Sequence, residues 1–191
     1  MARGFSQKEG IGYEETFFRV ARYTSIRTIM ALASMMKWDL HQMDVKTTFL
    51  NGVIAEEVYI EQPQGFEVED RRTHVCKLKK APYGLKQAPR TWYGSISSFL
   101  TSLGFAKSKE DPNLYFKVIE DEPVILLLYV DALFLIGNEK QIVECKKKLT
   151  EEFEMKDLSL MHYFLGLEVW QNSEGIFLNQ GKYAVEVFEN I

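Results

Sequence analysis

The chain has 191 residues, of which 46% are hydrophobic and 26% are charged, and its formal net charge is −4. This length and composition are typical of one large globular domain, or of one domain with a small subdomain. The acidic balance disfavours a strongly basic duplex-binding protein, and no apolar run reaches the roughly 18 residues that a membrane span needs. The N-terminus has no apolar signal core, so we expect an intracellular protein. Cys76 and Cys145 fit no metal or disulfide pattern and are interpreted as reduced packing residues.

Hydrophobic periodicity predicts helices and strands in alternation. The first half of the chain is predicted to form a helix over 23–38 capped by Thr24 or Ser25, a strand over 39–45 ending at Asp44, a hairpin of 58–62 with 74–80, and a helix over 88–103. The second half is predicted to form strands over 112–119, 123–130 and 132–137, a helix over 139–154, a hairpin of 161–170 with 175–180, and a helix beginning near 182. This order predicts an α+β fold, an antiparallel sheet of ferredoxin-like topology with helices on one face.

Asp131 stands inside an otherwise apolar stretch, and burying a lone carboxylate costs several kcal/mol unless it is paired. Asp44 ends another predicted strand. If the two strand ends adjoin, two carboxylates converge, and a hard divalent cation such as Mg²⁺ would neutralise them in a site suited to in-line phosphoryl transfer. The alternative is that both aspartates serve the backbone, Asp44 as a turn cap and Asp131 as a hairpin-turn residue.

The segment from Arg71 to Arg90 contains basic residues without any Asp or Glu. At its end Lys86, Gln87 and Arg90 surround a predicted helix start, where backbone donors and cations suit an anion. A solvated surface of ordinary charge is the alternative interpretation.

Several ordered motifs give the chain a family resemblance. They include "ARGFSQKEGIGYEETF", "HQMDVKTTFLNG", "CKLKKAPYGLKQAPRTWY", "LLLYVDALFLIG" and "FEMKDLSLMHYFLGLEV". Together they cover nearly the whole chain, which resembles the reverse transcriptase domain of copia-type retrotransposons. The resemblance implies a polymerase palm over about 38–49 and 86–170, incomplete fingers over about 1–37 and 50–85, and the start of a thumb-side region over about 171–191.

The resemblance also implies roles for single residues. Asp44 and Asp131 would be catalytic and, with the backbone carbonyl of Val45, would bind two Mg²⁺ ions, which Mn²⁺ can replace. Phe49, Lys86, Gln87 and Arg90 would bind the nucleotide, with Phe49 packing under the deoxyribose. Leu165 and Gly166 would form the hairpin that grips the primer. Looser matches place Arg22 and Arg27 near the triphosphate or template and Lys156 near the pyrophosphate. Ordinary core, helix-terminal and sheet positions are the alternatives for Phe49, Gln87 and the hairpin.

The chain departs from the family pattern at the second aspartate of the catalytic pair, which is Ala132. With one carboxylate fewer, we expect impaired activity, because losing a group that acts in the transition state costs orders of magnitude in rate. Phe18, Arg19, Thr48 and Pro82 are further departures. We therefore expect a fragmentary, decayed copy that begins partway through the fingers and ends before the thumb.

The sequence allows three functions. The first is template-directed DNA synthesis on a primed RNA or DNA template from deoxynucleoside triphosphates, in a cytoplasmic virus-like particle as the family implies. The second is an inactive nucleic-acid-binding remnant. The third is an unrelated ferredoxin-like RNA-binding module, which ranks last because its strands would need a Phe or Tyr pattern for base stacking. The sequence does not indicate the oligomeric state.

Overall fold

The computed structural model describes residues 7, 8, 10, 13, 22–54, 56–68 and 74–189. Phe18, Arg19 and the basic pair Arg71 and Arg72 lie outside the described residues. The chain divides into two compact units, one of residues 1–19 with 47–103 and the other of 20–46 with 104–191. In the described part of the chain, none of the helices combines the length and apolarity of a membrane span.

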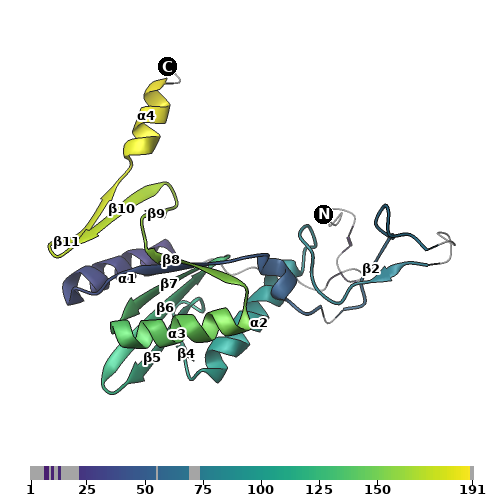
Figure 1. Ribbon diagram of the computed structural model, residues 1–191, viewed down its shortest axis with the longest axis horizontal. Helices are drawn as coiled ribbons and strands as arrows, with labels where there is room; N and C mark the ends of the chain where they lie inside the picture. Colours follow the sequence, from purple (N-terminus) through teal and green to yellow (C-terminus); the bar gives the residue numbers. More distant parts are fainter. Residues whose placement is uncertain are drawn as a thin grey trace. The chain divides into compact units, whose positions relative to one another are not determined.

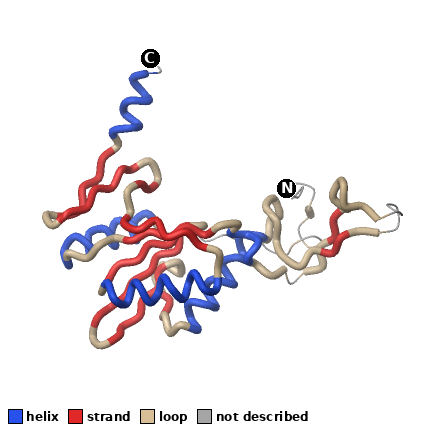
Figure 2. The backbone as a smooth tube through the Cα atoms, viewed as in Figure 1, coloured by secondary structure: helices blue, strands red, loops and turns tan. Residues whose placement is uncertain are grey.

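The second unit is built on a six-stranded sheet in which neighbouring strands are antiparallel (Figures 1 and 2). Its strand order is β4-β5-β6-β7-β1-β8. The strands are β1 His41–Val45, β4 Ala106–Lys107, β5 Leu114–Ile119, β6 Glu122–Tyr129, β7 Ala132–Gly137 and β8 Met155–Leu160. The predicted strands over 112–119, 123–130 and 132–137 are thus confirmed, whereas β4 and β8 were not predicted.

Helices cover both faces of this sheet. On one face α1 (Tyr23–Met36) shares a hydrophobic cluster with Phe134 and Ile136 of β7. On the other face His41, which pairs with Leu135, contacts α3 (Glu139–Glu152). The expected placement of helices on one face is therefore wrong. Every residue of β7 is buried, and such a strand needs cover on both sides, which is why its sequence is continuously apolar.

A smaller sheet and a last helix complete the second unit. The sheet has the order β11-β10-β9, from β9 Tyr163–Phe164, β10 Leu167–Asn172 and β11 Gly175–Asn179. Helix α4 (Gly181–Glu189) follows and has no buried residue among those described. The final hairpin is confirmed as β10 with β11, and so is the helix after it, but the strand predicted over 161–170 is divided into β9 and β10.

The first unit contains η2 (Thr48–Asn51), β2 (Tyr59–Ile60), β3 (Cys76–Lys77) and α2 (Ala88–Ser102). The predicted hairpin is confirmed as an antiparallel pair of β2 and β3, although it is only two residues long on each side. Its cluster of buried residues comprises Ile54, Ala81, Leu85 and Ala88. The compact units group 20–46 with the large sheet and 88–102 with η2, so their limits differ from the expected palm and fingers ranges, which stay a prediction.

The N-terminus of α1 is capped by a residue far away in the sequence. Arg22 occupies the N-cap position and its side chain makes no cap bond. Instead the buried Asp111 carboxylate accepts from the Arg22 backbone N–H at 3.0 Å and from the Ser25 hydroxyl at 2.6 Å. The predicted cap by Thr24 or Ser25 is therefore wrong, because both residues lie inside the helix and the Ser25 hydroxyl donates to Asp111.

Candidate catalytic site

The sheet brings the two strand-end aspartates together. Strands β1 and β7 pair with Asp44 directly opposite Ala132, and the Val45 N–H donates to the Asp131 carbonyl at 2.8 Å. Asp131 follows β6 in a two-residue turn, so the β6–β7 hairpin carries it to the end of β1. The predicted hairpin position of Asp131 is confirmed, and the strand that was expected to end at Asp44 continues to Val45.

The turn that presents Asp131 holds an unusual backbone conformation. Val130 has a φ of 54°, in the left-handed region that β-branched residues rarely adopt. Such strain persists only where the surrounding structure imposes it, and it concentrates at functional sites. The register of β6 and β7, from Val124↔Gly137 to Tyr129↔Ala132, leaves only Val130 and Asp131 to close the hairpin.

The electrostatics of Asp44 reflect this proximity. Its pKa is raised above the usual value, first by burial and then by repulsion from Asp131, while Lys156 opposes the shift. Asp44 is half-buried and Asp131 is exposed. Two carboxylates that repel each other in this way are a donor set that a hard divalent cation fits, because the cation offsets both charges.

Ala132 lies on the same sheet face as Asp44. The two residues are direct cross-strand partners, and side chains at such positions stand about 4.5–5.5 Å apart at Cβ. Ala132 is only 8% exposed and belongs to the cluster that also contains Phe134 and Phe164. A methyl group thus contacts the core at the position where the resemblance leads us to expect a carboxylate.

The remaining nucleotide-binding candidates lie in the first unit. Phe49 packs against the Leu85 and Ala88 cluster, and its ring centroid is 4.8 Å from that of Tyr83. Gln87 is buried, and its Oε1 accepts from the Gln7 amide at 3.0 Å. These contacts of Phe49 and Gln87 all lie within the first unit. The role of both residues toward a nucleotide therefore stays a prediction.

Lys86 and Arg90 flank Gln87 at the start of α2. The Lys86 ammonium donates to the Tyr13 hydroxyl at 3.1 Å and lies 4.8 Å from the centre of the Tyr13 ring. Exposed Arg90 lines an open recess together with Gln87, Thr91 and Ser98. Lys86 thus contacts both the hydroxyl and the ring of Tyr13. The anion-binding role expected at this helix start stays a prediction.

The predicted primer-grip residues form a tight turn. Leu165 and Gly166 link β9 to β10, with φ values of 47° and 80°. Two successive positive φ values are typical of a two-residue hairpin turn whose twist matches the strands. Leu165 is 51% exposed, so an apolar side chain projects from a turn where Asn or Gly would be easier. Of the looser matches, Arg27 is exposed on α1 and Lys156 pairs with Asp44 across β8 and β1.

Another group of possible metal ligands was not predicted. The donor atoms of Asp39, His41 and Glu139 all lie within 4.8 Å of one another. However, the Lys146 ammonium lies 3.0 Å from His41 Nδ1, and an ammonium only donates. Nδ1 must therefore accept, and Nε2 carries the proton that it donates to Glu139 at 3.0 Å. A metal on Nε2 would force a proton onto Nδ1 against the lysine, so this group is better explained as a hydrogen-bond network.

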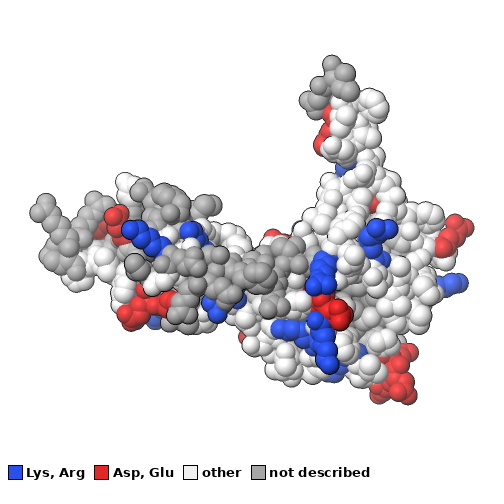
Figure 3. All heavy atoms as spheres, turned by 180° about the vertical axis from the view of Figure 1, so that it is seen from behind, with Lys and Arg blue, Asp and Glu red and all other residues white. Residues whose placement is uncertain are grey.

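Charge on the surface is mixed. Figure 3 shows basic side chains beside acidic ones among the described residues of the visible face. Within the predicted basic segment, Lys77 pairs with Glu57, which lowers the pKa of Glu57. The described part of this segment is therefore partly neutralised.

The comparisons with known proteins agree with the motifs. A family model described as reverse transcriptase (RNA-dependent DNA polymerase) matches residues 1–191, and the chain belongs to this family. It is similar to the retrovirus-related Pol polyprotein from transposon TNT 1-94 of Nicotiana tabacum, with 44% identity over 193 residues that cover 99% of this chain and 14% of that protein. It is also similar to the Pol polyprotein from transposon RE1 of Arabidopsis thaliana, with 38% identity, 98% of this chain and 13% of that protein.

A more distant relative is the transposon Ty1-MR1 Gag-Pol polyprotein of Saccharomyces cerevisiae, which is 28% identical over 177 residues covering 87% of this chain and 9% of that protein. The chain spans at most 14% of the length of these relatives. The resemblance to copia-type reverse transcriptases is confirmed.

Proposed function

We propose that this chain is the polymerase domain of a copia-type retrotransposon polyprotein, which extends a primer by nucleotidyl transfer on an RNA or DNA template. The observation that carries the proposal is the convergence of Asp44 and Asp131, fixed by the bond from the Val45 N–H to the Asp131 carbonyl. Deoxynucleoside triphosphates would be the substrates, and the family implies that synthesis occurs in a cytoplasmic virus-like particle.

The residues that would hold divalent ions are Asp44, Asp131 and the Val45 carbonyl. Bound Mg²⁺ or Mn²⁺ would supply positive charge that stabilises the attacking and leaving oxygens. In this arrangement Asp44 keeps a half-buried carboxylate beside that of Asp131, and a bound cation would relieve their repulsion. The strained turn at Val130 presents Asp131 at the strand end.

Ala132 is expected to impair this activity. Because it stands directly opposite Asp44, an aspartate there would add a third carboxylate on the same sheet face. Without it the site has less negative charge to hold ions near the primer terminus. Removing a group that acts mainly in the transition state costs about 10²–10³-fold in rate.

Primer extension with Mg²⁺ or Mn²⁺ tests the proposal. We expect Ala132→Asp to extend a primer at least about 100-fold faster than the unaltered chain. A matched control is the double variant Ala132→Asp with Asp44→Asn, which should lose the gain. Equal extension by the unaltered chain and the revertant would show that Ala132 does not impair the site. Extension that survives Asp44→Asn would remove Asp44 from the chemistry.

Ala132 also favours a second candidate function, an inactive remnant that binds primed template. Such binding would weaken steeply with salt, because phosphate contacts release counterions. Affinity for a primer–template measured between about 50 and 200 mM salt tests it. No affinity at low salt would exclude this remnant function.

A further inference from the structure

Strand β8 contains an irregularity next to Asp44. His41 pairs with Leu160, but Met43 pairs with Asp157, so two residues of β8, at 158 and 159, stand opposite Gln42 alone. Ser159 has a φ of 62°, as expected for the extra residue of a β-bulge. Beyond the bulge the pairs are Asp44↔Lys156 and Val45↔Met155.

The bulge decides which charge stands opposite Asp44. If β8 continued from the His41↔Leu160 pair without a bulge, each β1 residue would meet the next residue of β8, and Asp44 would face Asp157. A one-residue slip also turns every side chain to the other face of the sheet. Lys156 would then leave the face of Asp44, and a carboxylate would replace a cation beside the candidate site.

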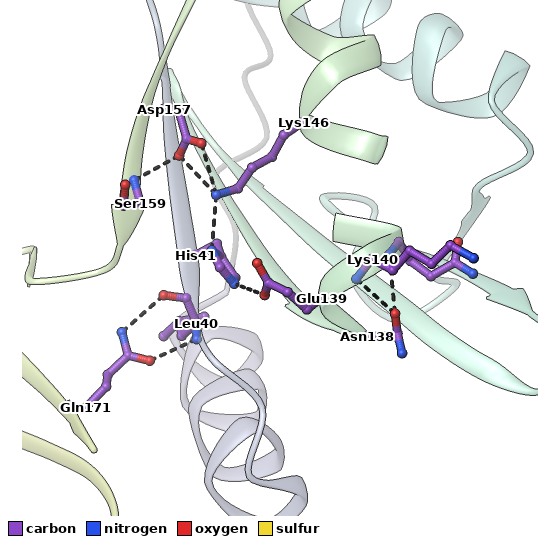
Figure 4. Close-up of polar contacts among 10 residues, drawn as sticks. Leu40, His41, Asn138, Glu139, Lys140, Lys146, Asp157, Ser159 and Gln171 are labelled. Carbon is purple, nitrogen blue, oxygen red and sulfur yellow. Dashed lines mark hydrogen bonds and ion pairs between the residues drawn. The ribbon is translucent and has the colours of Figure 1, made fainter. Parts of the chain in front are cut away.

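A network of polar side chains surrounds the bulge (Figure 4). The Asp157 carboxylate accepts from the Ser159 N–H at 2.8 Å and from the Lys146 ammonium at 3.0 and 3.1 Å. Lys146, whose side chain is 12% exposed, also donates to His41 Nδ1. His41 is 6% exposed and donates from Nε2 to Glu139 at the start of α3. The network thus connects β8, β1 and α3.

The network forms only in this register. Asp157 reaches Lys146 because the bulge turns it to the sheet face that α3 covers, the face of His41. Although burial works against it, the Ser159 N–H and Lys146 lower the pKa of Asp157. After a slip, Asp157 would lie on the opposite face and Lys146, nearly buried, would lose its carboxylate, which is costly for a charge.

We propose that Asp157, Lys146 and His41 are positioning residues that hold the β8 bulge and so place Lys156, rather than Asp157, opposite Asp44. The inference rests on the proposed function for its effect on primer extension, whereas the register itself is independent of activity. Lys156 then offers a cation on the sheet face of Asp44, as its direct cross-strand partner.

The register is tested by nuclear Overhauser contacts in the isotopically labelled full chain. We expect cross-strand contacts between Asp44 and Lys156 in the unaltered chain. Asp157→Ala and Lys146→Gln should each add contacts between Asp44 and the residue at position 157. The conservative change Lys146→Arg and the exposed control Lys147→Gln should not add them. A single unchanged set of contacts in Asp157→Ala and Lys146→Gln would overturn the proposal.

Deleting Ser159 gives a sharper control. Without this residue β8 pairs regularly from Leu160 onward, and Lys156 stays opposite Asp44 with no bulge to hold. Asp157→Ala should therefore change the register in the full-length chain and leave it unchanged in the Ser159-deleted chain. Sensitivity to Asp157→Ala in both chains would show a general structural role instead, and would also overturn the proposal.

The consequence for extension is measured in the Ala132→Asp background. We expect Lys156→Gln and Asp157→Ala each to slow extension per folded molecule about 10-fold, with rescue by Lys156→Arg. Because Asp157 acts through Lys156, the double variant should be no slower than Lys156→Gln alone. Additive losses would refute the positioning role. If the Ala132→Asp chain extends no primer at all, the proposed function fails, and the Overhauser contacts still decide the register.

Discussion

At the scale of single residues, Asp44 opposes the folding of the metal-free chain. Its raised pKa means that the native state holds the carboxyl proton more tightly than the unfolded chain does. Between the ordinary value of 3.8 and the higher native value, the native state binds more protons. The free energy of unfolding therefore falls as the pH rises through this window, and the cost persists at neutral pH.

Asp44→Asn is accordingly expected to stabilise the chain at pH 7. The gain should be about 0.5–1 kcal/mol, the range of a partly exposed charge interaction. It should disappear below pH 3.8, where the native carboxyl is protonated. Thermal unfolding from pH 3 to 8 measures it, with the exposed residue change Glu110→Gln as control. A gain that is independent of pH would contradict the electrostatic cause.

Val130 is a second residue that lowers the free energy of unfolding, because its backbone is strained. Glycine adopts its φ of 54° without the steric cost that a β-branched side chain incurs. We expect Val130→Gly to stabilise the chain by about 0.5–1 kcal/mol after the greater chain entropy of glycine is counted. Urea unfolding measures it, and Val118→Gly, at an exposed position inside β5, should destabilise instead. Destabilisation by both changes would argue against strain at the turn.

At the scale of elements, the sequence predicted the helices and strands whose formation depends on local patterns. Helix α3 and strands β5, β6 and β7 were found because apolar spacing repeats within each segment. The cap of α1 was missed because Asp111 is 89 residues from Arg22. The β8 bulge was also missed, since Ser159 gives no local signal for a positive φ. Its cause is a network across three elements.

Asp111 tests how much this distant cap contributes. Its carboxylate accepts from the N–H groups of Arg22 and Asn113 and from the Ser25 hydroxyl. Because Asp111→Ala leaves the buried Asn113 N–H and two partly buried donors without an acceptor, it should cost about 2–3 kcal/mol. Asp111→Asn, which keeps an acceptor oxygen, should cost less. Chemical denaturation gives the loss, and hydrogen exchange should show it first at the start of α1. Equal costs for both variants would mean that the volume of the side chain matters more than its acceptors.

At the scale of the whole molecule, the residues that the sequence predicted for the site belong to both compact units. Asp44, Asp131 and Ala132 meet in the sheet of the second unit. Phe49 and Gln87 belong to the first unit. The sequence motifs identified the family without a structure, because they occur in the order and at the spacing that the family shows. The register that makes Ala132 the direct partner of Asp44 needed the sheet, since nothing in the sequence sets β1 between β7 and β8.

The last prediction concerns the balance of stability and function across the molecule. Ala132→Asp replaces a methyl group that is 8% exposed with a third carboxylate facing Asp44. In the metal-free chain this should cost about 1–3 kcal/mol at pH 7. Mn²⁺ should recover part of the loss, because a ligand that binds only the native state stabilises it by mass action. Thermal unfolding with and without Mn²⁺ measures both effects. Ala132→Asn has nearly the same shape but no charge, so Mn²⁺ should recover much less of its loss. If Mn²⁺ raises the melting temperature of both variants equally, the ion does not bind at the carboxylate that the substitution adds.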